Sequence, residues 1–318
     1  MKQITLGTTG EKVSALCLGC MYLGTKVNEA MSFRILDAYA EADGCFLDTA
    51  NCYAFWIPGA TGNESETLLG RWMRVRNNRN RIFLATKVGA RPSGGSVGGP
   101  PEGLAARVIE QAVHESLRRL GTDTIDLLYT HIPDRSTPLE ETMEALDRLV
   151  RDGKVRFIGC SNEPAWRLER ARGLSRFHGW ASFCAVQNRY TYLRPKPGAV
   201  LPQVCISEEL LDYAAATAGV TLLAYSPLLG GAYARDEHAL PQEYATSDSR
   251  ARWKALSRAA RARGVSRGSL VLAWLMSGVP PIIPLVAAST VEHLRENLDA
   301  GKIMLDAGCI RDLTETAE

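Results

Sequence analysis

Three apolar runs of the sequence each end in a side chain that can carry charge or exchange a proton. Asp48 ends the first run, Lys87 the second and His131 the third, and Tyr53 follows Asp48 by five residues. Short apolar runs are typical of buried parallel strands, and the C-terminal ends of such strands converge on one crevice. We therefore expect Asp48, Tyr53, Lys87 and His131 to lie close together.

These four residue types suit the reduction of a carbonyl group by a nicotinamide. The reaction needs a hydride donor and an acid that protonates the nascent alkoxide. Tyr53 is the candidate acid, and the ammonium of Lys87 is expected to lower its pKa from the usual value of about 10. Asp48 would anchor Lys87, and His131 would hold the substrate oxygen near Tyr53 by a hydrogen bond.

Each of the four residues also has a purely structural interpretation. Asp48 and Lys87 could form an internal ion pair, Tyr53 could be a rim aromatic, and His131 a core histidine with its hydrogen bonds satisfied. Their joint placement at strand ends favours the catalytic interpretation. A lyase that forms a Schiff base on Lys87 is a further class of enzyme to consider.

The rest of the sequence alternates between strand-like runs and helical patterns. After a predicted hairpin over residues 2–16, strand-like runs occur at 16–19, 45–47, 81–87, 125–129, 155–160, 183–187, 220–225 and 282–285. Helical patterns occur at 29–42, 63–73, 101–120, 138–151, 163–172, 207–218, 249–263, 266–277, 291–300 and 307–316. Strands that alternate with helices predict a parallel sheet.

Eight strand–helix units predict an α/β fold, the (β/α)8 or TIM barrel, in a single domain that covers residues 1–318. The hairpin would cap the bottom of the barrel, and a long loop, residues 226–248, would follow the seventh strand. An open doubly wound sheet is the alternative, but no Gly-x-Gly-x-x-Gly motif follows the first strand. The glycine-rich segment 94–99 favours a flexible loop over a phosphate cradle.

The composition is that of an ordinary globular protein, with 46% hydrophobic residues, 23% charged residues and a formal net charge of +2. This balance predicts no binding to nucleic acid or membrane, and the arginine-rich run 71–81 is interpreted as a solvated helix end. No apolar stretch approaches the roughly 18 residues that cross a bilayer, and the N-terminus lacks a signal-peptide core, so we expect a cytoplasmic protein. The eight cysteines are expected to be buried apolar side chains, and no metal site is predicted.

Polar segments at the ends of three later strands favour a nicotinamide cofactor. Ser161, Asn162 and Gln187 could bind a carboxamide, and Tyr225 offers a flat face. Backbone amides over residues 226–230 could cradle a pyrophosphate. The alternative for each segment is an ordinary polar turn.

Four short motifs occur in the second half of the sequence. They are Gly-x-Ser-Asn from residue 159, Val-Gln-x-x-Tyr from residue 186, Tyr-Ser-Pro-Leu from residue 225 and Leu-x-Glu-Asn from residue 294. With the four residues above, they make nearly the whole chain resemble the aldo-keto reductases. The resemblance is closer to the bacterial, potassium-channel-β-like branch than to the mammalian aldose reductase branch. It implies a (β/α)8 barrel that reduces carbonyls with NADPH. The alternative is a cofactor-sensing regulatory subunit with low turnover, since channel β subunits share the fold.

The resemblance also implies residue roles. Asp48, Tyr53, Lys87 and His131 would be catalytic. The predicted cofactor ligands are Ser161, Asn162 and Gln187 at the carboxamide, Tyr225 stacked on the nicotinamide, Ser226, Leu228 and Gly230 at the pyrophosphate, and Glu296 and Asn297 at the adenine.

One departure from the family concerns the 2′-phosphate of NADP. Family members usually place a lysine or arginine just after the eighth strand to bind it, whereas residues 285–290 here contain no cation. Ser289 and Thr290 could still bind the phosphate, as could His293 or Arg295 from the next helix. NADPH is the predicted cofactor, and NADH is the alternative.

The expected substrate is a small-molecule carbonyl compound. The loops after the strands offer an aromatic and apolar rim that suits planar aldehydes or sugar rings, with Met21, Phe55, Trp56 and Trp166 as the predicted contacts and Tyr22, Tyr192 and Tyr233 as further candidates. Arg91, Arg189 and Arg194 could meet an anionic group, although solvated loop arginines are the favoured interpretation. The sequence predicts no oligomeric state.

Overall fold

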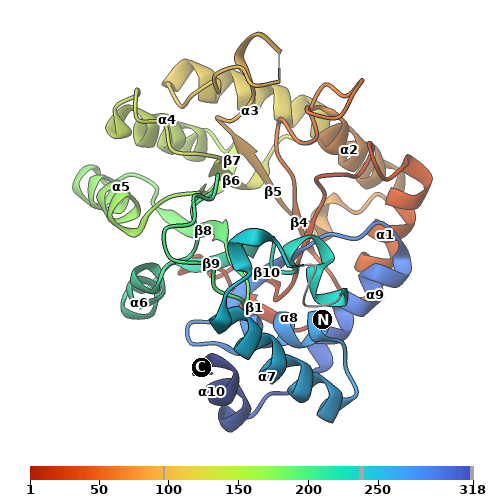
Figure 1. The fold of residues 1–318 in the computed structure, drawn as a ribbon. Coiled ribbons are helices and arrows are strands. Elements are labelled where there is room, and N and C mark those ends of the chain that lie inside the picture. The colour runs from red at the N-terminus through yellow and green to blue at the C-terminus, as the bar shows by residue number, and fades with distance from the viewer. Residues whose placement is uncertain (96, 236–239, 316–318) are drawn as a thin grey trace.

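Eight parallel strands close into a barrel at the centre of the protein (Figure 1). The structure is a computed structural model that describes residues 1–95, 97–235 and 240–315. The barrel strands are β3 (Cys17–Gly19), β4 (Phe46–Asp48), β5 (Phe83–Val88), β6 (Ile125–Thr130), β7 (Val155–Ser161), β8 (Phe183–Arg189), β9 (Thr221–Tyr225) and β10 (Ile282–Val286). Each strand pairs with its neighbour in sequence, and β10 pairs with β3 to close the ring. The predicted (β/α)8 barrel is therefore confirmed.

Helices surround the strands on the outside (Figure 1). They are α1 (Glu29–Glu41), α2 (Glu64–Arg76), α3 (Ala106–Leu120), α4 (Leu139–Arg151), α5 (Ala165–His178), α6 (Glu208–Ala216), α7 (Ser247–Arg263), α8 (Arg267–Ser277), α9 (Val291–Asp299) and α10 (Ala307–Thr314). Short 3-10 helices are η1 (Arg79–Arg81), η2 (Ser93–Gly95), η3 (Leu229–Ala234), η5 (Gln242–Tyr244) and η6 (Ala300–Lys302).

Alternate residues of each strand face opposite sides of the barrel wall, because side chains alternate along a β-strand. In β5, Phe83 and Ala85 pack in the cluster inside the barrel, whereas Leu84 and Val88 pack outward against the helices. Lys87 continues the inward set at the C-terminal end of β5. The same alternation puts Phe46 of β4 and Leu127 and Tyr129 of β6 inside the barrel, and it assigns Asp48 and His131, which lie two residues further along, to the same inward set.

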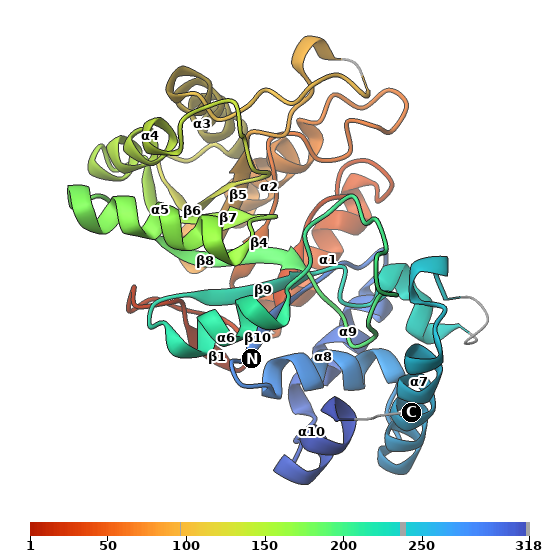
Figure 2. The same cartoon turned by 60° about the vertical axis from the view of Figure 1, so that its left-hand side comes forward.

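The N-terminal hairpin, β1 (Gln3–Thr5) paired with β2 (Lys12–Ser14), closes the bottom of the barrel as predicted. Leu6 and Val13 pack in the interior cluster, and the Gly7 amide donates to Thr221 Oγ1 over 2.7 Å. A Cβ at Gly7 would lie 2.7 Å from the carbonyl oxygen of Gly219, so only glycine fits this close approach. Figure 2 shows β1 at the opposite end of the strands from the loop that follows β8.

The two largest errors in the predicted helix boundaries concern α3 and α5. The helix predicted from residue 101 begins at Ala106, because Gly103 has a φ of 81° and interrupts any helix before it. The helix predicted to end at 172 continues to His178, where Gly179 takes the left-handed conformation that ends many helices. The long loop after the seventh strand is present and contains η3 and η5, although residues 236–239 of it lie outside the described part. Ser96 of the glycine-rich segment and residue 316 of the last predicted helix also lie outside it.

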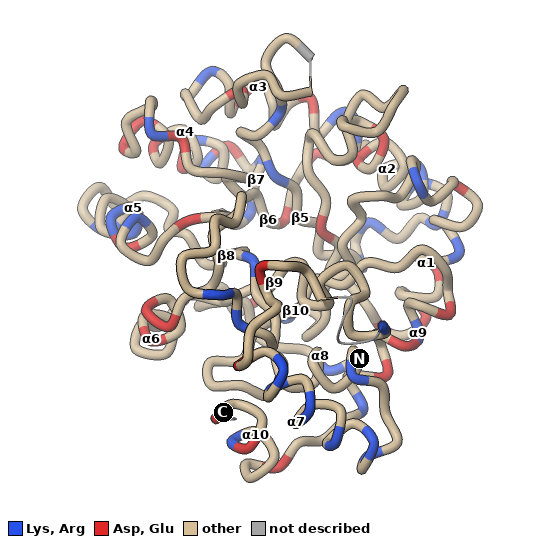
Figure 3. The backbone as a smooth tube through the Cα atoms, in the orientation of Figure 1, with Lys and Arg blue, Asp and Glu red and all other residues tan. Residues whose placement is uncertain are grey.

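Basic and acidic residues are mixed over most helices, but Lys and Arg follow one another along α7 (Figure 3). Arg250, Lys254, Arg258 and Arg261 are exposed at helical spacing there. Within the described ranges, no helix combines the length and the apolar character that a membrane span requires.

Candidate active site

Lys87 lies at the centre of the buried polar cluster at the top of the barrel. Its Nζ lies 2.5 Å from Asp48 Oδ1 and 2.5 Å from the Tyr53 hydroxyl, and it donates to the carbonyl oxygen of Thr49 over 2.8 Å. Asp48 is 0% exposed and Lys87 is 1% exposed. An ammonium has three donor hydrogens, and this geometry gives each of them an oxygen acceptor.

Asp48 receives two further hydrogen bonds besides that of Lys87. The Tyr53 hydroxyl donates to Oδ1 over 3.2 Å, and Gln187 Nε2 donates to Oδ2 over 2.8 Å. A fully buried carboxylate is stable only when it is paired and hydrogen-bonded. The carboxylate therefore fixes Lys87, Tyr53 and Gln187 at once, and Gln187 reaches the site from a strand 139 residues away in sequence.

His131 follows β6 and completes the group that the sequence predicts. Its backbone amide donates to the carbonyl oxygen of Val88 over 2.8 Å, which fixes the start of the loop. Its ring centroid lies 5.8 Å from that of Tyr53, in an edge-on arrangement. Burial, and secondarily the positive charge of Lys87, lower the pKa of His131 to about 3. The imidazole is therefore neutral near pH 7 and can donate only from the nitrogen that carries its one proton.

The pKa of Tyr53 differs from the sequence-based expectation. Burial of the phenol and the negative charge of Asp48 raise it well above the usual value, whereas Lys87 was expected to lower it. Removal from water penalises the phenolate, and the nearby carboxylate adds to that penalty. Tyr53 thus keeps its proton at neutral pH and is a proton donor in this environment.

The four predicted catalytic residues Asp48, Tyr53, Lys87 and His131 are called the tetrad below. Beside them, the side chain of Asn162 connects three strands. Its Nδ2 donates to the carbonyl oxygen of His131 over 3.0 Å and to Ser161 Oγ over 3.2 Å, and its Oδ1 accepts from the Tyr225 hydroxyl over 2.7 Å. Ser161 Oγ in turn donates to the carbonyl oxygen of Gln187 over 2.7 Å. The four residues predicted to contact the nicotinamide end of the cofactor are thus brought together in one hydrogen-bonded chain.

The segment after β9 has unusual backbone geometry. Ser226 and Leu229 have φ values of 53° and 47°, and Gly230 and Gly231 have values of 63° and 82°. Positive φ is uncommon for residues other than glycine and is concentrated at functional sites. The amides of Leu229 and Gly231 already donate to the carbonyl oxygens of Ser226 and Leu228, so an anion could meet only amides of this turn that remain without a backbone partner. The predicted pyrophosphate segment, which includes the half-buried Leu228, therefore fits a phosphate group only through those amides.

The predicted adenosine segment between β10 and α9 is more open. Ser289 and His293 are exposed, and Ser289 Oγ lies 3.0 Å from His293 Nδ1. Thr290 Oγ1 accepts from the His293 amide over 3.2 Å and caps α9. Asn297 Nδ2 donates to the carbonyl oxygen of Ala287 over 3.2 Å and so ties the helix to the loop, while Glu296 is exposed.

The predicted rim residues Met21, Phe55, Trp56 and Trp166 all lie in or just after loops at the C-terminal ends of strands. Trp56 is 40% exposed and packs edge-on against Phe55, and Trp166 is 50% exposed. Arg135 lies over the Trp166 ring, with its guanidinium carbon 5.9 Å from the centroid. Tyr22 and Met21 are half-buried.

The prediction that two further tyrosines contact the substrate is wrong. Tyr192 and Tyr233 are at most 2% exposed, so neither can form a rim. Arg91 donates to the carbonyl oxygens of Thr61 and Asn51 and to Asn63 Oδ1. Asn63, which directly precedes α2, therefore binds Arg91 through its side chain and does not cap the helix with it. In a similar way, Arg189 donates to the Tyr244 hydroxyl over 3.3 Å and to Gln203 Oε1 over 3.0 Å, whereas Arg194 is exposed.

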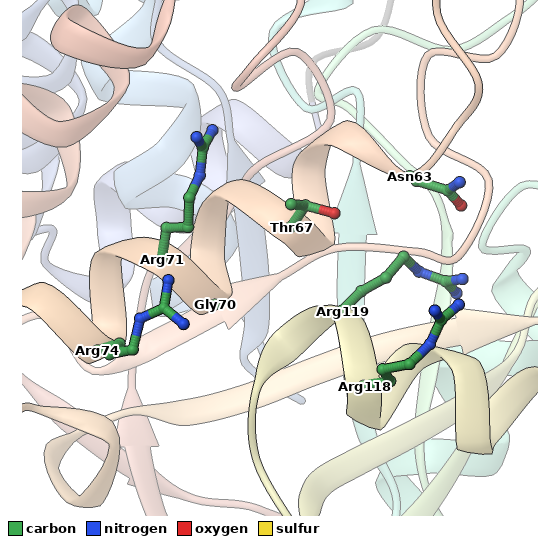
Figure 4. A pocket seen from close by; sticks show the side chains of 7 residues that line it. All are labelled: Asn63, Thr67, Gly70, Arg71, Arg74, Arg118 and Arg119. Atoms are coloured by element: carbon green, nitrogen blue, oxygen red, sulfur yellow. The ribbon is translucent and has the colours of Figure 1, made fainter.

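A groove of about 400 Å³ lies on the outside of the barrel between α2 and α3 (Figure 4). It is lined by Asn63, Thr67, Gly70, Arg71, Arg74, Arg118 and Arg119, and by no residue of the tetrad. Arg119 pairs with the buried Glu66 over 2.6 Å, and Arg71 pairs with Glu29 over 2.8 Å. The pair of Arg71 with Glu29 is about half exposed, which agrees with a solvated helix surface, whereas the pair of Arg119 with Glu66 is buried. In the described part of the chain, no three or more His, Cys, Asp or Glu side chains are arranged to hold a metal ion.

Two members of the site were not found from the sequence. Cys52 Sγ lies 3.8 Å from His131 Nδ1, and Thr49 supplies a backbone oxygen to Lys87. Every residue has a backbone carbonyl oxygen, so the sequence does not indicate which of them accepts a hydrogen bond. Cys52 had a usable signal, because it directly precedes the predicted acid Tyr53.

Comparisons with known proteins agree with this geometry. The sequence model of the Aldo/keto reductase family matches residues 15–318. Norsolorinic acid reductase stcV of Emericella nidulans is 33% identical over 326 aligned residues, which cover 96% of this chain and 79% of that protein. The uncharacterized oxidoreductase YrpG of Bacillus subtilis is 32% identical, with 99% of this chain and 95% of that protein covered.

Two further proteins extend the comparison. An NADP(+) aryl-alcohol dehydrogenase of Phanerodontia chrysosporium is 30% identical over 96% of this chain and 83% of its own length. The crystal structure of a thermostable aldo-keto reductase, in complex with the inhibitor epalrestat, matches this structure with a TM-score of 0.78 and 28% identity. That match covers 100% of both chains.

Proposed function

This chain belongs to the aldo/keto reductase family, and from that membership we propose that it reduces a ketone or an aldehyde to an alcohol with NADPH. The bound reduced nicotinamide would supply the hydride. Tyr53 gives its proton to the nascent alkoxide, and His131 donates a hydrogen bond to the same oxygen. NADH is the alternative cofactor.

The observation that carries this proposal is the contact of Lys87 with both Tyr53 and Asp48, at 2.5 Å each. The nascent alkoxide is a stronger base than a phenolate, so the proton of Tyr53 moves to it even though burial raises the tyrosine pKa. Lys87 then stabilises the phenolate that remains, and Asp48 holds Lys87 in place. Each residue of the tetrad therefore has a role that its contacts support.

We propose that the cofactor lies across the top of the barrel, along the residues named for its three parts. Ser161, Asn162, Gln187 and Tyr225 fit the nicotinamide end, because they form a rigid hydrogen-bonded chain next to His131. The positive-φ segment after β9 fits the pyrophosphate. Ser289, His293, Glu296 and Asn297 would then be near the adenosine.

The exposed aromatic side chains support a planar carbonyl substrate. Trp56 and Trp166 are exposed and Phe55 is half-buried, and all three lie in or just after loops at the C-terminal ends of strands. Two relatives are named for norsolorinic acid and for aryl alcohols, which supports an aromatic aldehyde or ketone as the substrate class of this chain.

The contacts of Lys87 argue against the lyase alternative. A Schiff base requires a free amine lone pair that attacks the carbonyl carbon. Nζ instead lies within 2.8 Å of three oxygen acceptors, as an ammonium does. Lys87 is therefore suited to electrostatic stabilisation and not to nucleophilic attack.

The proposal is tested by the Tyr53→Phe variant, with NADPH and para-nitrobenzaldehyde as probes. We expect NADPH to quench tryptophan fluorescence as in the wild type, while turnover falls about 10²- to 10⁴-fold because the acid is lost. Tyr213→Phe is a matched control. Its hydroxyl donates to Glu169 Oε2 over 2.6 Å on the outer helices, so its loss should leave turnover unchanged.

Two results would contradict the proposal in different ways. Undiminished turnover in Tyr53→Phe would remove Tyr53 from the mechanism. A wild-type protein that binds NADPH tightly but reduces no aldehyde or ketone would favour the cofactor-sensing alternative.

A further inference from the structure

The thiol of Cys52 contacts the imidazole of His131 inside the proposed active site. Sγ lies 3.8 Å from Nδ1, and Cys52 is only 2% exposed while His131 is half-buried, so the thiol is shielded from solvent. Among residues 1–95, 97–235 and 240–315, Sγ has no second hydrogen-bond partner. Among the described residues, the imidazole of His131 is therefore the only hydrogen-bond partner of the Cys52 thiol.

The two ring nitrogens of His131 have different surroundings. Nδ1 faces the Cys52 thiol, whereas Nε2 makes no hydrogen bond to any residue that the structure describes. The adjacent Tyr53 ring packs edge-on at 5.8 Å. Nε2 is thus the nitrogen left to bond a substrate oxygen.

The tautomer of His131 decides whether Nε2 can donate. Burial and Lys87 lower the pKa of His131 to about 3, so the ring is neutral and holds one proton. A proton on Nε2 gives a hydrogen-bond donor toward the carbonyl. A proton on Nδ1 would leave only a lone pair at Nε2, which repels the carbonyl oxygen.

The chemistry of the thiol sets the direction of its hydrogen bond. Burial raises the pKa of Cys52 to about 12, so the thiol keeps its hydrogen. Thiol sulfur is a weak acceptor, whereas an unprotonated imidazole nitrogen accepts well. A bond from S–H to Nδ1 is therefore favoured over a bond from Nδ1–H to sulfur.

We propose that Cys52 is a positioning residue that donates its S–H to Nδ1 of His131 and holds the ring in the tautomer that carries the proton on Nε2. The effect of this tautomer on catalysis rests on the role proposed above for His131 in carbonyl reduction. The tautomer itself is a property of the protein alone and can be measured without turnover.

The direct test is a tautomer measurement on the full chain labelled with ¹⁵N-histidine. Long-range ¹H–¹⁵N correlation spectra distinguish protonated from unprotonated imidazole nitrogens, and His131→Asn identifies which of the five histidines gives the His131 signals. In the wild type, we expect Nδ1 unprotonated and Nε2 protonated. Cys52→Ser keeps a donor and should keep this pattern, whereas Cys52→Val should move the two nitrogen shifts toward each other.

Turnover of para-nitrobenzaldehyde with NADPH gives the second measurement. Cys52→Val should lower kcat/KM by roughly two- to tenfold, the worth of one modest hydrogen bond, and Cys52→Ser should lose less. Cys205→Val is the matched control, because Cys205 is half-buried and makes no contact with His131. It should change neither the spectra nor kcat/KM.

A wild-type spectrum with the proton on Nδ1 would overturn the proposal. So would a Cys52→Val spectrum identical to that of the wild type. Both results are independent of Tyr53→Phe, so a failure of the proposed carbonyl reduction is distinguishable from a failure of this inference.

Discussion

The two ends of the proposed cofactor path differ in how far their polar side chains are buried and paired. At the tetrad end, Asp48 and Lys87 are at most 1% exposed, and their charges are paired and hydrogen-bonded. At the end between β10 and α9, Ser289 and His293 are exposed and share a single hydrogen bond of 3.0 Å. Burial forces polar groups into fixed partnerships, whereas exposed groups can be exchanged at little cost. This difference explains how the family's usual cation can be absent from one end while the other keeps its full set of residues.

The largest effect should follow from breaking the buried ion pair with Lys87→Met. The change leaves the Asp48 carboxylate buried without its cation, so we expect turnover to be lost and the free energy of unfolding to fall by about 3–5 kcal/mol. Urea unfolding and turnover of para-nitrobenzaldehyde measure the two effects. The double variant Asp48→Asn/Lys87→Met removes both charges, and it should recover most of the stability but none of the turnover. A single variant as stable as the wild type would show that the pair is not buried as described.

The pH dependence of kcat/KM tests the tetrad end without substitution. The pKa of His131 is lowered to about 3, so the ring stays neutral as the pH falls well below 7. The pKa of Tyr53 is raised above its ordinary value, so the phenol stays protonated as the pH rises. Both pKa shifts widen the pH range in which His131 is neutral and Tyr53 is protonated. We therefore expect kcat/KM to stay flat from about pH 5 to about pH 9. An acid limb near the ordinary histidine pKa of about 6.5 would contradict the burial of His131.

A smaller effect is expected at the junction between the two ends. Tyr225→Phe keeps the ring proposed to stack on the nicotinamide but removes the 2.7 Å hydrogen bond to Asn162. Losing one such bond should weaken cofactor binding by roughly two- to tenfold. NADPH and NADH share the nicotinamide, so fluorescence titrations should show the same factor for both. Unequal factors would place Tyr225 near the 2′-phosphate instead.

The fold and the tetrad were predictable because strand geometry repeats. Side chains alternate along a strand and parallel strands end at one face, so Asp48, Lys87 and His131 converge whatever their detailed partners are. Exact partners were less predictable. The bond from Gln187 to Asp48 joins strands 139 residues apart, and no local pattern encodes it.

The burial of individual side chains was also not predictable from the sequence. The raised pKa of Tyr53 follows from removal of the phenol from water, which outweighs the effect expected from its neighbour Lys87. Tyr192 and Tyr233 were candidates for an exposed rim because they lie in loops, yet both are packed inside the protein. Aromatic residues in long loops serve packing as often as recognition, and only the folded chain distinguishes the two.

The smallest effect should come from the exposed end, where His293→Ala removes the imidazole that lies 3.0 Å from Ser289 Oγ. An exposed side chain that contacts the 2′-phosphate from solvent contributes little binding free energy, so we expect NADPH to bind about two- to fivefold more weakly and NADH to be unaffected. Ser289→Lys is the opposite variant, because it restores a cation near the place where the family carries one, and it should tighten NADPH binding alone. Fluorescence titrations of both variants with both cofactors measure the discrimination directly. Equal changes for NADPH and NADH would mean that this end of the path does not read the phosphate, and that the enzyme uses either cofactor.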